Sequence, residues 1–139
     1  DRPDNAIITA GQDLRKLSIP FRYENLGNVQ ASQLNEVYNR CAAGLVLSLS
    51  NLSLLPLELL SAGVIPVVND GENNRLVSGN PFIRYTPPIP RALADALISI
   101  VDREDLAEHA ARASASAETA DWAASGKQFL RAFEEGMRG

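Results

Sequence analysis

The sequence is short of the residues that build metal centres and nucleophilic active sites. It holds one cysteine, Cys41, and one histidine, His109, which lies among alanines in a predicted helix. A single cysteine excludes an internal disulfide bond and a cysteine-rich zinc site. A single histidine in that position excludes Ser–His–Asp and Cys–His catalysis and favours a surface or packing role. We therefore expect no catalytic residue, no metal and no cofactor in this chain.

Long apolar runs and clusters of positive charge are also missing. No run approaches the length that spans a bilayer, and the first residues lack the pattern of a signal peptide. The 13 Lys and Arg against 17 Asp and Glu give a net charge of −4, and the longest basic run is Arg15–Lys16. That balance argues against a nucleic-acid partner. Together these absences predict a cytoplasmic location.

Two phosphate-binding motifs are absent, and what is present is an ordinary globular composition. No Gly-Lys-Ser/Thr follows a predicted strand, and Gly-x-Gly-x-x-Gly does not occur. The chain is 45% hydrophobic and 22% charged over 139 residues, the usual size of one domain. Short apolar runs between turn formers predict strands. These runs are Ala6–Ala10, Phe21–Tyr23, Leu45–Leu49, Ile65–Val68 and Phe82–Tyr85, of which the first and third are expected to be buried.

Helical patterns alternate with these strands. An apolar stripe runs from Leu34 to Ala42, with Ser32 as its expected cap and Gly44 as its stop. A short helix follows the third strand, with a proline in its first turn and Gly63 just past its end. This alternation predicts an α/β fold with a Rossmann-like parallel sheet flanked by helices.

The remaining helices complete a single expected domain over residues 1–139. Apolar spacing predicts a helix at Leu93–Val101 and C-terminal helices over 104–139, broken near Glu118–Asp121. Trp122 and Phe133 in the last segment are expected to be packing anchors rather than ligand contacts.

Ligands of open parallel sheets bind beyond the carboxyl ends of the strands. That rule selects the turns that follow the predicted strands. The most informative turn leaves Leu45–Leu49 and enters a helix N-terminus, where free N–H groups and the helix dipole favour an anion such as a diphosphate. Ser50, Asn51 and Ser53 add short polar side chains there. The four selected turns are Gly11–Asp13, Asn25–Gln30, Ser50–Leu55 and Asn69–Asn74.

Two charged residues near these turns have two interpretations each. Glu58, in the first turn of the short helix, either complements the helix dipole, worth about 0.3–1 kcal/mol, or accepts hydrogen bonds from the hydroxyls of a ribose. Position alone leaves these interpretations even. Arg75 either offers charge to a diphosphate or is a solvated surface residue.

The run from Ser50 to Val68 resembles the donor-site signature of retaining GT-B glycosyltransferases of the glycosyl transferases group 1 type. That signature reads Glu-Gly-Phe-Gly-Leu and then Glu-Ala-Met-Ala-Cys-Gly-x-Pro-Val-Val, with seven residues between the two glutamates, which aligns Glu58 with the second. Leu26–Val29 with Leu34 and Val37–Tyr38 is similar to the family's Leu-Gly-x-Val and Glu-Leu-x-x-x-Tyr stretch. Other similar segments are Ile8–Gly11, Leu93–Leu97 and Asp121–Trp122.

The resemblance implies the donor-binding, C-terminal half of an enzyme that transfers a hexose or deoxyhexose from a nucleoside diphosphate without a metal. It favours the ribose role for Glu58, and it implies that backbone N–H groups of Ser53 and Leu54 meet the diphosphate. The other donor contacts it implies are Ser50 and Asn51 at the sugar, Asn28 and Val29 at the base, and Gly11 in the first glycine turn.

A difference from the family signature at Ser50, and the absence of other parts of the family's architecture, limit which functional residues can be assigned from the resemblance. Ser50 stands where the family's first glutamate touches the transferred sugar, which resembles a rhamnosyltransferase-like branch. The chain opens without Met and without the acceptor-binding domain, so we expect a longer enzyme in which that domain binds a glycan or lipid-linked acceptor, with peripheral membrane association. This chain alone is expected to be inactive or to bind donor weakly.

Two other functions remain to be weighed. The alternative is a non-catalytic α/β binding module that keeps the fold but not donor binding, which the departure at Ser50 leaves open. A phospho-acceptor receiver domain is disfavoured, because no aspartate follows Leu45–Leu49.

Overall fold

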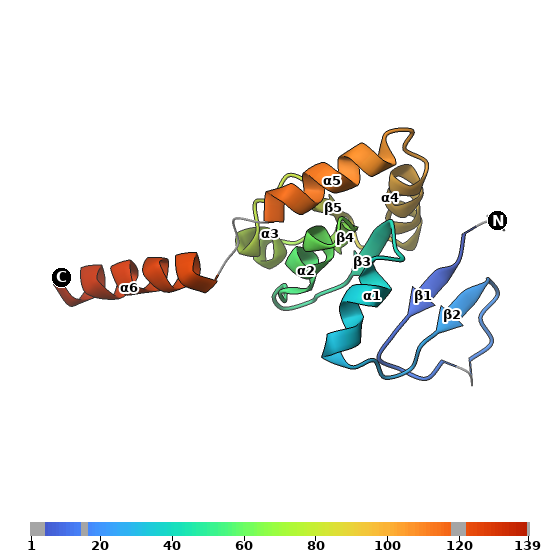
Figure 1. Ribbon diagram of the computed structural model, residues 1–139, viewed down its shortest axis with the longest axis horizontal. Helices are drawn as coiled ribbons and strands as arrows, with labels where there is room; N and C mark the ends of the chain where they lie inside the picture. The colour runs from blue at the N-terminus through green and yellow to red at the C-terminus, as the bar shows by residue number, and fades with distance from the viewer. Residues whose placement is uncertain (1–4, 15–16, 118–121, 139) are drawn as a thin grey trace. The chain divides into compact units, whose positions relative to one another are not determined.

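The computed structural model describes residues 5–14, 17–117 and 122–138 (Figure 1). The chain divides into two compact units, residues 1–41 and 42–139, and each is described by itself. That residues 1–139 act as a single domain stays a prediction. The expected break near Glu118–Asp121 lies outside the described residues.

The first unit contains a two-stranded parallel sheet. Strand β1 (Ile7–Thr9) pairs with β2 (Tyr23–Asn25), with Ile7 opposite Tyr23 and Thr9 opposite Asn25. The predicted β1 position is confirmed, whereas β2 lies two residues later than Phe21–Tyr23. The expected burial of β1 is wrong, because none of the described residues before position 42 is buried. Two strands offer too little area to bury an apolar face.

A short helical segment follows β2. The 3₁₀ helix η1 (Ala31–Gln33) leads into α1 (Leu34–Tyr38). Ser32 was predicted as the cap but lies inside η1, and the Gln30 N–H at its start donates instead to Gln33 Oε1 at 3.2 Å. The predicted helix also ends early, because the chain turns over residues 39–42 to let Ala43 pair with Ile65.

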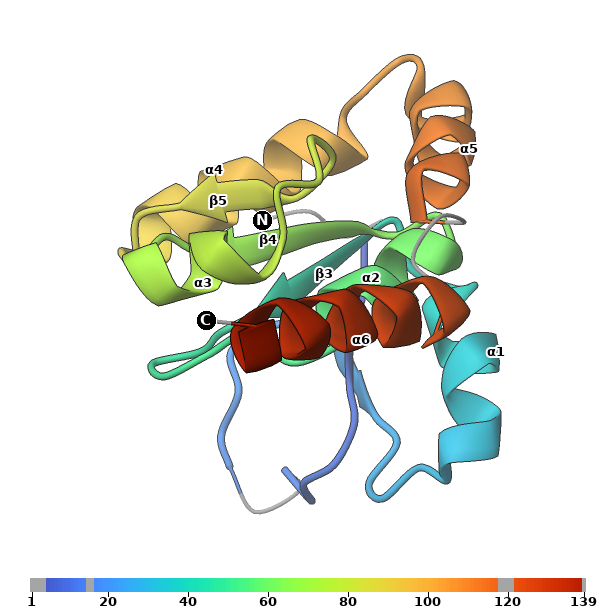
Figure 2. The same cartoon turned by 90° about the vertical axis from the view of Figure 1, so that its left-hand side faces the viewer.

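The second unit is built on a three-stranded parallel sheet in the order β3–β4–β5 (Figure 1, Figure 2). Helix α4 packs across all three strands, α2 packs on β3 and β4, and α5 packs on α2. Parallel strands flanked by helices confirm the expected α/β, Rossmann-like fold. The strands are β3 (Ala43–Val46), β4 (Ile65–Asn69) and β5 (Arg84–Thr86); the helices are α2 (Leu55–Ser61), α3 (Glu72–Val77), α4 (Pro90–Val101), α5 (Leu106–Ala117) and α6 (Trp122–Arg138).

The core of this unit surrounds β4, which is buried along its whole length. Helix α2 ends in a Schellman motif beneath it: the Gly63 N–H donates to Leu60 O at 2.8 Å and the Val64 N–H to Leu59 O at 2.9 Å. Gly63 has a φ of 74°, a left-handed conformation that glycine adopts without a Cβ penalty. The predicted end of this helix at Gly63 is therefore confirmed.

Strand β3 differs from the prediction in both position and burial. It begins at Ala43, so Gly44 lies inside a strand and does not stop the preceding helix. A Cβ on Gly44 would stand 2.7 Å from Leu59 Cδ1, so a larger residue here would force the Leu59 side chain to shift. The expected burial of Leu45–Leu49 on both faces is wrong, since Leu47 is 60% exposed. Leu47 lies beyond the end of β3, in the loop that leads to α2.

The end of the sheet differs as well. Strand β5 begins at Arg84, two residues later than predicted, because the Phe82 N–H donates to Asn80 Oδ1 at 2.9 Å and forms a turn. Helix α3, where only a loop was expected, follows β4. Helix α4 confirms the helix predicted from apolar spacing and buries Leu93, Ala96 and Ile100.

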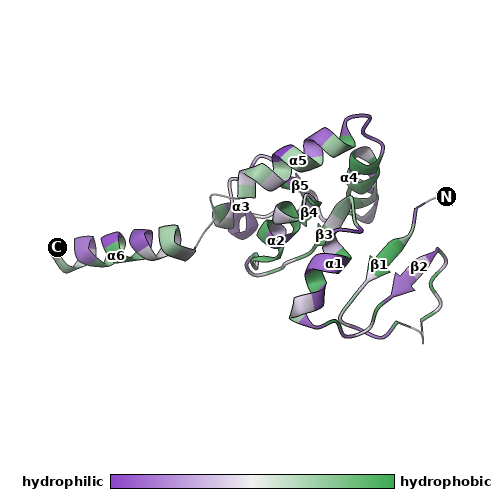
Figure 3. Ribbon diagram, in the orientation of Figure 1, coloured by the Kyte–Doolittle hydropathy of each residue, from purple (hydrophilic) through white to green (hydrophobic). Residues whose placement is uncertain are grey.

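The C-terminal helices α5 and α6 confirm the helical character expected for 104–139. Polar and apolar residues alternate along α6 (Figure 3). Phe133, expected to be a packing anchor, is 58% exposed, so that prediction is wrong. The Trp122 side chain lies outside the described residues. In the described part of the chain, no helix is both long and apolar enough to cross a bilayer.

The contact between β3 and α2 gives the first prediction. Gly44→Ala inserts a methyl group against buried Leu59, which must shift, so we expect the free energy of unfolding to fall by about 1–3 kcal/mol. Gly79→Ala is the matched control, because nothing lies within 4 Å of its added Cβ. Urea denaturation of both variants measures the difference. Equal stability of the two variants would contradict the close approach of α2 to β3.

Candidate functional site

Two asparagines join the loops at the carboxyl ends of β3 and β4. Asn69, the last residue of β4, donates through Nδ2 to Ser48 O at 2.7 Å, and its Oδ1 accepts the Ser48 N–H at 2.7 Å. Asn74 of α3 donates through Nδ2 to Ser48 O at 3.2 Å and to Asn69 O at 2.9 Å. Both side chains are buried, at 6% and 3% exposure. The sequence pattern indicated only a turn here.

Two buried acceptors at this edge of the sheet are unused. Asn74 Oδ1 and Thr86 Oγ1 receive no hydrogen bond from the described residues. Buried polar atoms are normally hydrogen-bonded, so these two stand out against the well-bonded amide groups beside them.

The loop between β3 and α2, residues 47–54, carries four of the eight predicted donor contacts. Its polar residues Ser50, Asn51 and Ser53 are exposed, while Leu52 is buried and anchors the loop to the core. Ser48 Oγ donates to Asn51 O at 2.7 Å, and Ser50 Oγ lies 3.1 Å from Asn51 Oδ1. The loop therefore presents short polar side chains on a backbone held at both ends.

Helix α2 begins directly after this loop. The Leu55 N–H donates to Ser53 Oγ at 3.3 Å, whereas the N–H groups of Ser53 and Leu54 donate to no acceptor within the described residues. Pro56 occupies the first turn, as predicted, and Glu58 is exposed in the same turn. The structure thus brings Ser50, Asn51, Ser53, Leu54 and Glu58 together at one helix start.

Arg75 is held by neighbours of its own. Its Nε and Nη2 donate to Asp70 Oδ1 and Oδ2 at 2.6 and 2.9 Å, and its guanidinium lies 4.9 Å from the centre of the Tyr85 ring. The Arg75 hydrogen bond holds the pKa of Asp70 below its ordinary value. The Tyr85 hydroxyl contacts Asn74 O and Ser78 O, and burial raises its pKa. This cluster fixes α3 against β5.

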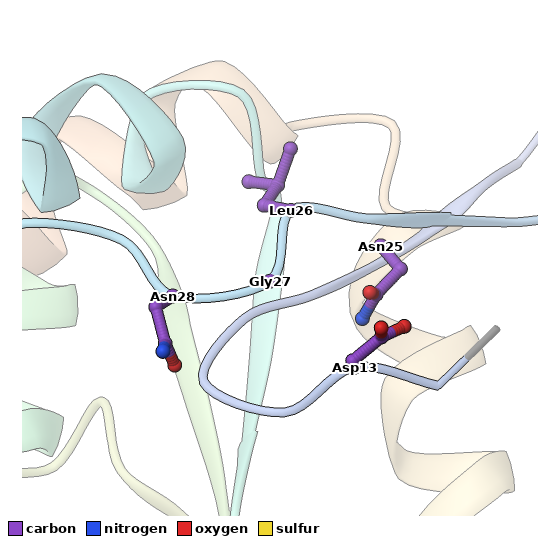
Figure 4. A pocket seen from close by; sticks show the side chains of 5 residues that line it. All are labelled: Asp13, Asn25, Leu26, Gly27 and Asn28. Atoms are coloured by element: carbon purple, nitrogen blue, oxygen red, sulfur yellow. The ribbon is translucent and has the colours of Figure 1, made fainter. Parts of the chain in front are cut away.

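The first unit has an open pocket of about 400 Å³ at the carboxyl ends of β1 and β2. It falls in the size range of small-molecule sites. Asn25 shapes it by donating through Nδ2 to Thr9 Oγ1 at 2.9 Å and to Gln12 O at 2.8 Å. Its side chain and that of Asp13 point toward one another (Figure 4). The lining residues are Asp13, Asn25, Leu26, Gly27 and Asn28.

Three predicted donor residues belong to this region of the first unit. Asn28 lines the pocket, and its side chain is exposed. Val29 follows it in the chain but is not among the lining residues, and neither is Gly11. Gly11 supports the pocket from outside, because its N–H donates to Gly27 O at 2.7 Å. Asp13 and Asn25 belonged to turns selected from sequence without being singled out as contacts.

The single histidine packs against an aromatic ring, and the described acidic residues form no metal-binding group. The His109 ring packs 5.2 Å from the Phe82 ring, which confirms the packing role, and burial lowers its pKa. Across residues 5–14, 17–117 and 122–138, no group of three or more His, Cys, Asp or Glu side chains is placed to hold a metal ion.

Parallel sheets with helices on their faces and polar loops at their carboxyl ends define a Rossmann-like α/β protein. Residues 1–98 match the sequence model of the family described as "WsaF, C-terminal domain", and the chain belongs to that family. It is therefore a C-terminal domain of the glycosyltransferase-related kind. The match covers the first unit and the second as far as most of α4. No curated protein matches the chain.

The Asp70–Arg75 pair gives the second prediction. Arg75→Gln removes the main cause of the lowered pKa, so we expect the Asp70 pKa to rise toward the ordinary aspartate value of about 3.9. Carbon-detected NMR titration of the carboxyl groups measures it.

The same pair has a defined effect on stability. Because the folded-state pKa of Asp70 is lowered, the ion pair stabilises the fold above the ordinary pKa, and this contribution is lost as the pH falls through the lowered value. Arg91→Gln, which removes the exposed partner of Asp95, is the control and leaves Asp70 unchanged. An Asp70 pKa that does not move in Arg75→Gln would contradict the assigned cause.

Proposed function

We propose that this chain binds the nucleoside diphosphate sugar of a glycosyltransferase that transfers a hexose or deoxyhexose. The observation that carries the proposal is the loop 47–54 running into α2, where exposed Ser50, Asn51 and Ser53 stand beside two backbone N–H groups without an acceptor. Such groups suit the oxygens of a diphosphate. Membership of a glycosyltransferase-related family supports a nucleotide sugar as the source of that diphosphate.

Glu58 is the proposed ribose contact. Its carboxylate is exposed in the first turn of α2, one turn from the N–H groups of Ser53 and Leu54. A carboxylate accepts hydrogen bonds from both vicinal hydroxyls of a ribose. Ser50 and Asn51 then face the sugar. In this proposal helix N–H groups and other donors of the protein meet the diphosphate charge.

The pocket of the first unit is the proposed base site. It is small, open and polar at its rim, and Asn28 supplies an exposed side-chain amide that both donates and accepts hydrogen bonds. Val29 follows Asn28 in the same loop. Gly11 contacts that loop through the hydrogen bond from its N–H to Gly27 O.

The resemblance of Ser50–Val68 to the donor-site signature of GT-B glycosyltransferases also suggests what the whole enzyme is. We infer that the chain is the C-terminal half of a GT-B enzyme of a rhamnosyltransferase-like branch, acting in the cytoplasm with peripheral membrane association. A further domain would bind the glycan or lipid-linked acceptor. In that arrangement this chain holds the donor and supplies no catalytic residue.

Nucleotide titration tests the donor site, which is the third prediction. We expect UDP, GDP or dTDP at millimolar concentration to shift the backbone amide signals of Ser53, Leu54 and Glu58, and those of the loop containing Asn28. Two-dimensional NMR of the labelled chain gives the result. If none of the three nucleotides moves these signals, the non-catalytic binding module is the better description.

Glu58→Ala separates the ribose role from the dipole role and is the fourth prediction. Loss of charged hydrogen bonds worth about 1.5–3 kcal/mol weakens nucleotide affinity roughly 10- to 150-fold. Glu72→Ala is the matched control, because Glu72 is also an exposed glutamate in the first turn of a short helix. Each variant is expected to lose about 0.3–1 kcal/mol of stability through the dipole effect. Equal nucleotide affinity in the two variants would leave only the dipole role for Glu58.

A further inference from the structure

We infer that Asn69 is a positioning residue: it sets where the loop 47–54 leaves the sheet and so where that loop presents its polar groups. The expected effect on nucleotide-sugar binding rests on the proposed function. The effect of Asn69 on the conformation of the loop can be tested without a ligand. Asn69 itself is buried at the end of β4, and in this proposal it does not contact the nucleotide sugar.

The first step is the way Asn69 holds Ser48. Strand β3 ends at Val46, whose partner Val68 is the last paired residue of β4 on that side. Two residues further on, both backbone groups of Ser48 bond to the single side-chain amide of Asn69, each at 2.7 Å. One side chain therefore replaces the partner strand at the point where the ladder has ended.

The second step is the rigidity of Asn69. A buried amide with both its oxygen and its nitrogen engaged has little freedom to rotate. Asn74 reinforces it by donating to both Ser48 O and Asn69 O. The Asn74 carbonyl in turn lies 3.1 Å from the Tyr85 hydroxyl, which donates a hydrogen bond to it. A chain of bonds thus ties the loop to β5 through α3.

The third step is what lies beyond Ser48. The loop has one other anchor in the core, the buried side chain of Leu52. Ser50 and Asn51 lie between these two anchors, exposed, and their printed bonds stay within the loop. Ser53 follows them, also exposed, and its Oγ accepts the Leu55 N–H at the start of α2. Releasing Ser48 frees the first anchor and lets these groups move. Preformed geometry of polar groups is what a binding site requires.

The test compares Asn69→Ala with Asn80→Ala in the whole chain. Asn80 is the matched control, because its amide also ties a loop, by accepting the Phe82 N–H and donating to Ser116 Oγ, but at the start of β5. We expect Asn69→Ala to lose hydrogen-exchange protection of the Ser48 N–H and to weaken nucleotide binding by about tenfold or more. Asn80→Ala keeps both, although it also loses stability.

Asn74→Ala covers the case in which Asn69→Ala does not fold. It removes two bonds to the loop and to β4 but leaves the Ser48 N–H bonded to Asn69, so we expect faster exchange across 47–54 and a smaller loss of affinity. Thermal melting confirms that each variant is folded.

Three results would contradict either the role of Asn69 or the proposed function, and they distinguish between the two. The inference is wrong if the Ser48 N–H exchanges as slowly in Asn69→Ala as in the wild-type chain. It is also wrong if Asn69→Ala and Asn80→Ala lose nucleotide affinity equally. A wild-type chain that binds none of UDP, GDP and dTDP sinks the proposed function instead. In that case, loss of Ser48 protection in Asn69→Ala still supports the holding of the loop.

Discussion

Burial of β4 along its whole length is the constraint on which the second unit depends. Strand β4 is packed against helices α2 and α4 and lies between β3 and β5 in the sheet. Asn69 is buried with the rest, and a buried amide needs hydrogen-bond partners. It finds them in the backbone of Ser48, outside the strand ladder. The same burial that makes the core therefore places the first anchor of the loop 47–54.

Features with short-range sequence signals were predictable. The apolar run at β4, the apolar stripe of α4 and the glycine after α2 each depend on residues within a few positions of one another. Gly44 shows the limit of such signals. A glycine after an apolar stripe is typical of a helix end, yet Gly44 lies inside β3, where an added Cβ would stand 2.7 Å from Leu59 Cδ1 of α2. That contact joins residues fifteen positions apart.

Burial and helix α3 were not predictable from local patterns. An apolar run does not say whether a second layer covers it, and so Ile7 and Leu47 are exposed although their runs indicated buried strands. Helix α3 has no apolar periodicity to indicate a helix. Its place is fixed by Tyr85, eleven residues from Asn74, whose hydroxyl contacts the helix backbone, and by the pairing of Arg75 with Asp70 just before its first residue. Polar residues thus hold an element that apolar spacing does not mark.

The polar residues of the loop 47–54 could be named from sequence, but the residues that hold them could not. Asn69 follows an apolar run and reads as a turn former; only its burial and its partners identify a structural role. That role has weight because α2 has only seven residues. The dipole effect of a helix is confined to its first turn, so a short helix contributes to anion binding mainly through direct hydrogen bonds from its first N–H groups. Direct hydrogen bonds depend on distance and angle more steeply than a diffuse field does. The conformation of the loop before α2 would therefore decide how well the proposed site binds a diphosphate.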